Sequence, residues 1–327
     1  MDTGTHVVMG IALGGLATLD PIVANSEITA QAVMFGTIIG SQAPDLDTVL
    51  KLKNNAKYIR NHRGITHSIP AVLLWPILIT STIYAFTPSA DLLHLWIWTF
   101  IAVFLHVFVD IFNAYGTQAL RPLSKKWVAL GIINTFDPFI FFVHIIGIAI
   151  WRYGYDPGFT FLGVYIVLLG YYFVRYFTKR LIIKKVKEHI PNATQIIISP
   201  TYRYNQWHLA ISSETRFYVA RAIDNELTFL DEYEKIPVPD TSVMKAAMKD
   251  ENLSAFLSFS PVYRWEVDEY NDHYEVRFID LRYRSKGYYP FVAVVQLDQS
   301  LNIVSSYTGW IFSEEKLMKK LEIASEN

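Results

Sequence analysis

The chain has 327 residues, of which 52% are hydrophobic, and its formal net charge is −1. It contains no cysteine, which excludes disulfides, thiolate metal ligands and cysteine nucleophiles. Residues 1–189 have 15 Lys and Arg against 10 Asp and Glu, whereas residues 190–327 have 14 against 20. A basic, apolar half and an acidic, polar half indicate two domains, and so small a basic excess does not favour nucleic-acid binding.

Six apolar runs of near-spanning length follow one another in the first half. They lie at residues 5–19, 28–44, 68–87, 92–112, 138–152 and 159–177. A membrane-spanning helix needs about 20 mostly apolar residues. The sequence therefore predicts a multi-pass α-helical membrane domain of about six helices over residues 1–177. The first run contains His6 and has no basic region before it, which favours a retained helix over a cleaved signal peptide.

The charges of the connecting loops predict the orientation in the membrane. Lys and Arg occur in the loops 45–67 and 113–137, whereas the loops 20–27, 88–91 and 153–158 contain neither. Loops rich in Lys and Arg normally face the cytoplasm. We therefore expect a protein of the plasma membrane with both termini on the cytoplasmic side.

The pattern changes beyond the sixth run. Residues 178–189 predict a basic helical connector, which suits the anionic inner leaflet of a membrane. Residues 190–327 predict a cytosolic α+β domain, because short runs of β-branched and aromatic residues occur together with helical patterns. The expected strands are TQIIISPTY, RFYVARAI, YEVRFIDLRYR and FVAVVQLD, and the expected helices are MKAAMKDENLSAFLSF and SEEKLMKKLEI.

His and Asp side chains gather at one end of the predicted membrane helices. Five separate segments place them at a similar depth on the cytoplasmic side. The residues are His6, Asp45, Asp47, His62, His67, His106, Asp110 and Asp137. Ionisable residues within or beside membrane helices are costly, so they are candidates for a functional site.

The residue types in this cluster favour a metal. Imidazole and carboxylate without thiolate suit a hard or borderline divalent ion such as zinc, manganese or iron. His106 and Asp110 are four residues apart and share one helical face, so they can bind one ion or bridge two. Four His and four Asp exceed what one tetrahedral ion requires. The sequence predicts a divalent metal site, with zinc or manganese favoured and room for a second ion, in which some of these residues orient the ligands.

Each motif alone also has a purely structural interpretation. A single His–Asp pair on an apolar helix is more often a satisfied buried pair than a ligand site, and PDLD alone is usually a turn. Arg63 and Arg121 fit a phosphate contact and a topology-setting positive charge equally well. We interpret His94 and His144 as structural. The coincidence of five segments at one depth is the observation that favours a site.

The polar motifs occur in a characteristic order. They are THVVMG, APDLD, HRGITHS, HVFVD and NAYGTQALRPLS, followed by the DP that begins at Asp137. In this order they resemble the family of membrane-bound metal-dependent hydrolases of the LexA-regulated inner-membrane type. The resemblance covers residues 1–170 and implies a metal-dependent hydrolase in which the eight His and Asp residues above are implicated by motif position. It implies no particular substrate, and the acidic tail lies outside it.

Together these observations predict a hydrolase at the cytoplasmic face that acts on a lipid phosphate ester or another membrane-associated substrate. Asp47, His62 and Arg63 are the expected catalytic residues, and Arg63 and Arg121 are the expected phosphate contacts. Membrane lipids are the expected partners.

Two other functions remain open. The chain could be a cation- or proton-coupled transporter, although such proteins usually bind near the midplane between repeated halves, and we detect no repeat. It could also be a membrane-anchored regulatory protein whose tail binds a cytosolic partner.

Overall fold

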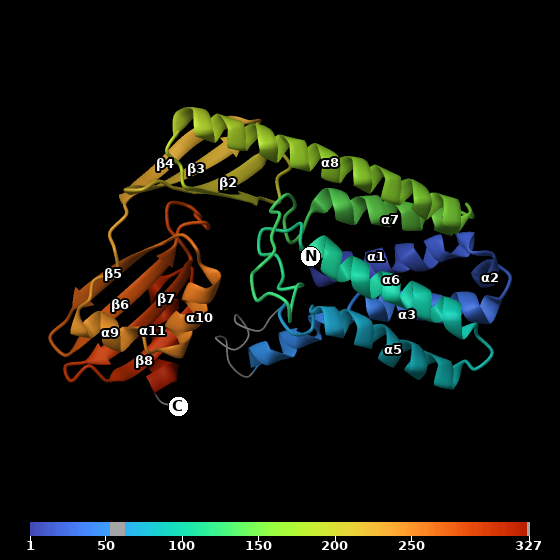
Figure 1. The fold of residues 1–327 in the computed structure, drawn as a ribbon, viewed down its shortest axis with the longest axis horizontal. Coiled ribbons are helices and arrows are strands. Elements are labelled where there is room, and N and C mark those ends of the chain that lie inside the picture. Colours follow the sequence, from blue (N-terminus) through green and yellow to red (C-terminus); the bar gives the residue numbers. More distant parts are fainter. Residues whose placement is uncertain (53–62, 326–327) are drawn as a thin grey trace. The chain divides into compact units, whose positions relative to one another are not determined.

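The computed structural model describes residues 1–52 and 63–325. A helical N-terminal region is followed by a C-terminal region of β-sheets with three further helices (Figure 1). The chain divides into two compact units, of which the first comprises most of residues 1–180 together with Pro200–Tyr204. The second unit comprises the rest of the chain, which includes Leu181–Ser199 and the residues from Asn205 onward. The prediction of a helical region followed by a domain that contains strands is therefore confirmed.

All six apolar runs form helices. These are α1 (Thr3–Leu16), which continues into the 3-10 turn η1 (Ala17–Leu19), α3 (Glu27–Gly40), α5 (Ile69–Phe86), α6 (Leu92–Asp110), α7 (Pro138–Arg152) and α8 (Pro157–His189). The short helix α2 (Pro21–Ala24) and the 3-10 helix η2 (Ala43–Leu52) lie between them. Polar side chains that accept a backbone N–H of the first turn define where helices begin. These caps include Asp2, Ser26, Ser68, Asp91 and Asp137.

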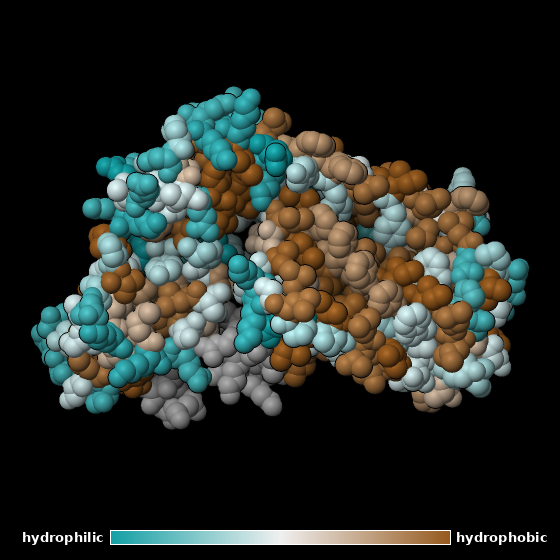
Figure 2. All heavy atoms as spheres, viewed as in Figure 1, coloured by the Kyte–Doolittle hydropathy of each residue, from teal (hydrophilic) through white to brown (hydrophobic). Residues whose placement is uncertain are grey.

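Within the described part of the chain, α5, α6 and α8 are long and apolar enough to cross a membrane. The helices α1, α3 and α7 are apolar but shorter, so the expected count of six crossing helices is not confirmed. Within the apolar 18-residue stretch of each of these three helices, only 17–39% is buried inside the protein. Hydrophobic residues accordingly cover most of the visible face of the helical unit (Figure 2). An outward apolar surface of this kind suits contact with lipid.

The sixth apolar run and the predicted basic connector form one continuous helix, α8, of 33 residues. Lys and Arg are good helix formers, so the change from apolar to basic sequence does not interrupt the helix.

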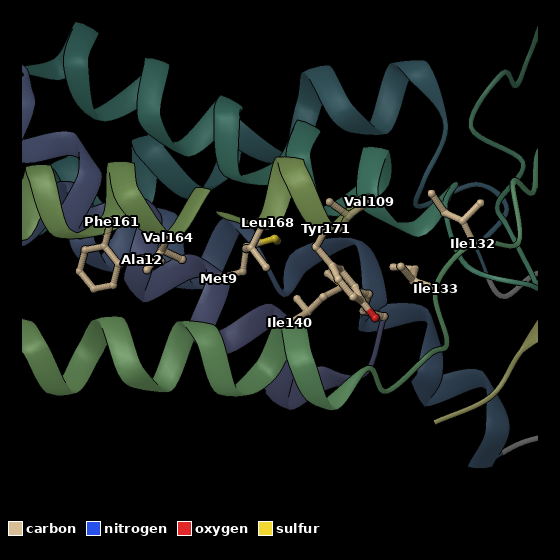
Figure 3. Packing of buried hydrophobic residues seen from close by; sticks show 11 residues of the cluster. Met9, Ala12, Val109, Ile132, Ile133, Ile140, Phe161, Val164, Leu168 and Tyr171 are labelled. Carbon is tan, nitrogen blue, oxygen red and sulfur yellow. The ribbon is translucent and has the colours of Figure 1, made fainter. Parts of the chain in front are cut away.

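The core of the helical unit lies between α1, α7 and α8 (Figure 3). Met9 of α1, Ile140 of α7 and Leu168 of α8 belong to one buried cluster. On another side, Gly10 allows α1 to approach α3 closely, because a Cβ atom there would lie 2.8 Å from Cα of Ile38. This contact brings the beginning of α1 beside the end of α3.

The C-terminal region contains two four-stranded sheets. Their strand orders are β1 (Gln195–Pro200), β2 (Gln206–Ser212), β3 (Arg216–Ile223), β4 (Glu226–Glu234), and β5 (Tyr263–Glu269), β6 (His273–Asp280), β7 (Phe291–Asp298), β8 (Ile303–Trp310). The pairings from β2 to β4 and from β5 to β8 are all antiparallel. The expected strands correspond to β1, β3, β6 and β7, and the other four strands lie outside the predicted runs.

Three helices accompany the second sheet: α9 (Ser242–Ala247), α10 (Glu251–Phe259) and α11 (Glu314–Ser325). Phe256 of α10 packs in one buried cluster with Phe278 and Phe291 of the sheet. The stretch MKAAMKDENLSAFLSF forms α9 and α10 instead of one helix, because the Asp250 side chain accepts the N–H of Leu253 and starts α10.

Candidate metal centre

Four of the predicted ligands converge in the helical unit. Asp45, His67, His106 and Asp110 each offer one ligand atom, and these four atoms all lie within 4.8 Å of one another. Asp45 comes from η2, His67 precedes α5, and the other two lie on α6. His67, His106 and Asp110 are fully buried, and Asp45 is largely so. These residues are called the four-residue group below.

The spacing within the group suits a small divalent ion. Nε2 of His67 lies 3.3 Å from Nε2 of His106, 3.6 Å from Oδ1 of Asp45 and 3.5 Å from Oδ2 of Asp110. Nε2 of His106 lies 3.7 Å from each of the two carboxylate oxygens. A tetrahedral ion with ligand bonds of about 2.0–2.2 Å places its ligand atoms about 3.3–3.6 Å apart. The observed separations are close to these values.

Both imidazole rings are oriented through their Nδ1 atoms. Nδ1 of His106 lies 2.6 Å from the carbonyl oxygen of Ser41 and donates to it, because a carbonyl only accepts. Nδ1 of His67 lies 3.1 Å from Oγ1 of Thr66, whose hydroxyl donates to Oδ2 of Asp47 at 2.7 Å. Oγ1 therefore accepts from His67. Each ring thus presents an Nε2 lone pair to the centre of the group, as a metal ligand must.

The carboxylates of the group fit a cation as well. Oδ1 of Asp45 and Oδ2 of Asp110 are buried and have no hydrogen-bond partner among the described residues. Burial raises the pKa of Asp45, whereas the positive charge of the nearby Arg63 lowers it. Nε of Arg63 also lies 3.3 Å from Oδ2 of Asp110. Buried carboxylate oxygens are costly unless positive charge neutralises them.

His6 borders the four-residue group. Its ring stacks on that of His106 with centroids 3.7 Å apart, and its Nε2 lies 3.5 Å from Oδ1 of Asp110. The same carboxylate oxygen forms an ion pair with the amino group of Met1, which lies 3.0 Å from Nε2 of His6. Asp110 thus faces the four-residue group with one oxygen and His6 with the other.

Asp47 and Arg63 stabilise the turn that residues 63–68 form before α5. Oδ2 of Asp47 accepts the backbone N–H of Arg63 at 2.9 Å in addition to the Thr66 hydroxyl. Arg63 is buried, has a φ of +58°, and lies with Nε 3.3 Å from Oδ2 of Asp110. Its guanidinium also donates to the carbonyl oxygen of Met1 at 3.2 Å. Asp47 therefore positions the turn, and Arg63 brings positive charge to the site.

The other candidates take different positions. Asp137 accepts the N–H of Phe139 at 3.1 Å and the hydroxyl of Tyr171 at 2.9 Å, and burial raises its pKa. It caps α7 and is not part of the four-residue group. His62 lies outside the described residues. The roles of both as ligands stay predictions.

The remaining basic candidates are also separate from the group. His94 lies at the opposite end of α6 from Asp110, with Nδ1 2.7 Å from Asp91. His144 is buried within α7. Nε of Arg121 is buried without a hydrogen-bond partner among the described residues, and its contact with a substrate stays a prediction.

The motif NAYGTQALRPLS packs on the turn of residues 63–68. The N–H of Gln118 donates to the carbonyl oxygen of Arg63 at 2.9 Å. Oδ1 of Asn113 accepts the N–H of Gly116 at 2.7 Å, and Gly116 has a φ of +70° that favours glycine. The motifs that contain Thr66 and Asn113 were recognised in the sequence, but these two residues and Ser41 were not predicted to belong to the site.

Comparisons with known proteins agree with this division of the chain. The family described as YdjM inner membrane protein matches residues 1–182. Those described as YfhP middle domain and YfhP C-terminal alpha/beta plait domain match residues 191–233 and 242–321. A Bacillus subtilis (strain 168) relative, described as "Uncharacterized protein YfhP", is 64% identical over 326 residues, which cover 99% of this chain and 100% of the relative.

No solved structure matches the chain. The matched descriptions support an inner membrane protein family, and they do not confirm the metal-dependent hydrolase type that the motifs implied. The match over residues 1–182 contains every member of the four-residue group. The chain belongs to the YdjM inner membrane protein family.

Proposed function

We propose that the chain is a membrane-embedded, metal-dependent hydrolase that acts at the cytoplasmic face on a lipid phosphate ester or another membrane-associated substrate. The observation that carries this proposal is the four-residue group. The two imidazole nitrogens lie 3.3 Å from each other and 3.5–3.7 Å from the two carboxylate oxygens. Both rings are oriented in the tautomer that binds metals.

The residues around the site divide the chemical roles. Asp45, His67, His106 and Asp110 would hold the ion. A bound divalent ion would activate water for attack and neutralise negative charge that develops on the substrate. Arg63 adds a positive charge that suits a phosphate oxygen. We assign proton transfer to His6, whose Nδ1 is buried without a hydrogen-bond partner among the described residues.

The choice of metal decides whether the site can be catalytic. A catalytic ion needs a coordination position that the protein leaves open. Octahedral manganese has more ligand positions than the four residues fill. A tetrahedral zinc ion bound by all four would be closed to substrate, so zinc would require one carboxylate to remain outside its coordination shell. Manganese is therefore the ion for which the complete group would leave coordination positions open.

The position of the group favours an enzyme over a transporter. Asp110 is the last residue of α6, His67 lies two residues before α5, and Asp45 follows the end of α3. Transporters usually bind substrate and ions near the membrane midplane. A site at the ends of the helices instead lies near one interface, where a lipid head group lies.

The same type of substitution, Asp to Asn, made separately at each end of α6 tests the proposal. Asp110→Asn removes a proposed ligand, whereas Asp91→Asn changes the cap of the same helix to another good cap. We expect the wild type to contain a divalent metal and to hydrolyse lipid phosphate esters in vesicles. Asp110→Asn should lower both by roughly tenfold or more, and Asp91→Asn should retain both. Equal losses from the two variants, or a metal-free and inactive wild type, would contradict the proposal.

A further inference from the structure

An apolar cavity of about 500 Å³ lies within the helical unit. Its lining includes Met9 of α1, Val109 of α6, Ile140 of α7 and Leu168 of α8, which converge in Figure 3. Cavities that hold small ligands usually measure about 300–1,000 Å³ and have mostly apolar walls. The cavity therefore has the size and the chemistry of a binding site for an apolar group.

The rim of the cavity belongs to two helices that are long enough to cross a membrane. Leu169 and Phe173 of α8 and Phe108 of α6 line the cavity, and all three are exposed, Leu169 by 59%. At the surface of such helices the surrounding material is the acyl chains of lipids. These chains are the occupant that matches both the rim and its environment.

Two residues connect the cavity with the four-residue group. Val109 lines the cavity, and its neighbour in the chain, Asp110, belongs to the group. Met1 also lines the cavity, while its amino nitrogen pairs with Oδ1 of Asp110. A chain bound in the cavity would consequently have its polar end close to Asp110.

His144 provides a buried polar atom in the cavity wall. It is 1% exposed, and its Nδ1 lies 2.8 Å from the carbonyl oxygen of Ile140. Nε2 has no hydrogen-bond partner among the described residues. Buried polar atoms are nearly always paired with protein atoms, water or a ligand, so Nε2 is a polar point in an otherwise apolar wall. Because Nδ1 donates to the carbonyl, Nε2 is left to accept, for example from a hydroxyl group.

We propose that this cavity binds the acyl chain of the lipid phosphate ester on which the four-residue group acts. The inference rests on the proposed function and specifies its substrate class. The apolar wall receives the chain, the exposed rim admits it from the bilayer, and Asp110 lies where the ester end arrives. Long-chain phosphate esters are then the substrates, and short-chain esters lack the part that the cavity recognises.

The test uses two substitutions on the same helix of the full-length protein. Leu169→Trp adds bulk at the rim of the cavity, at a position exposed enough to spare the core. Ile166→Trp is the matched control, because Ile166 is 62% exposed on α8 and does not line the cavity. Each protein is placed in lipid nanodiscs. Immobilisation of spin-labelled stearate is measured by electron paramagnetic resonance, and hydrolysis of hexadecyl phosphate is compared with that of butyl phosphate.

We expect the wild type and Ile166→Trp to immobilise the spin label and to hydrolyse the long ester faster than the short one, because only the long chain reaches the cavity from the bilayer and fills it. Leu169→Trp should lose immobilisation and the long-chain preference, so that it hydrolyses the two esters at similar rates. No immobilisation together with equal rates for both esters, or equal effects of both substitutions, would overturn the cavity proposal and leave a hydrolase in place. If Leu169→Trp alone removes the immobilisation and neither ester is hydrolysed, the result would support the cavity proposal and overturn the proposed activity.

Discussion

Nε2 of His67 lies 3.3 Å from Nε2 of His106 in the buried interior of the helical unit, although 39 residues separate them in the chain. The opposite nitrogen of each ring is occupied by a neighbouring oxygen. Two nitrogen lone pairs held face to face repel each other unless a positive charge lies between them. With two carboxylate oxygens at similar distances, a divalent ion would supply that charge.

The hydroxyl of Thr66 should determine metal affinity without touching the ion. Thr66→Val keeps the shape of the side chain but removes the oxygen that links Nδ1 of His67 to Asp47. We expect bound metal to weaken about 10–100-fold, as is typical when the partner of a ligating histidine is removed. Thr66→Ser keeps the hydroxyl and should restore most of the affinity, measured by competition with a chelator. Equal affinity in Thr66→Val and the wild type would contradict this role.

Asp137 should contribute to stability and leave metal binding unchanged. Asp137→Ala removes the cap of α7 and the acceptor of the Tyr171 hydroxyl, at a cost of about 1–3 kcal/mol, which thermal unfolding would detect. Asp156→Ala is a matched control, because Asp156 accepts the N–H of Phe159 at 2.9 Å and is exposed. It should cost less. Loss of bound metal from Asp137→Ala alone would restore the ligand role that its motif position implied.

The orientation in the membrane can be measured because the chain has no cysteine of its own. Ser89→Cys places a thiol between α5 and α6, and Lys126→Cys places one in the basic loop before α7. The positive-inside rule predicts that a membrane-impermeant maleimide added to intact cells labels the first variant and not the second. Labelling of both from the same side would remove the argument that the site faces the cytoplasm.

The helices were predictable from the sequence because their signals are local. Each apolar run begins within two residues of the start of the helix that it forms. Polar caps such as Ser68 and Asp91 mark where helices start. Whether α1, α3 and α7 cross a membrane depends on tilt and on neighbouring helices, and sequence patterns do not contain that information. In the C-terminal region, β4 and β5 carry many charged residues, so their apolar patterns are weak.

The candidate site was predictable as a set of residues at one depth, and less so as a geometry. His106 and Asp110 follow from the helical repeat, which puts residues four apart on one face. Which of the other residues meet them depends on how each helix is rotated, and depth alone does not specify rotation. Asp47 and Asp137 therefore lie outside the four-residue group and contact other partners. The support that Ser41 gives to His106 comes from a backbone oxygen, which no side-chain motif encodes.

Elemental analysis of the purified full-length protein tests the central claim most directly. The wild type should contain at least one divalent transition-metal ion per chain. The double substitution His67→Ala with His106→Ala removes both nitrogen ligands and should abolish bound metal. The matched control, His94→Ala with His144→Ala, removes two histidines outside the four-residue group and should retain it. A wild type without metal, or a His67→Ala and His106→Ala protein that retains it, would contradict the account.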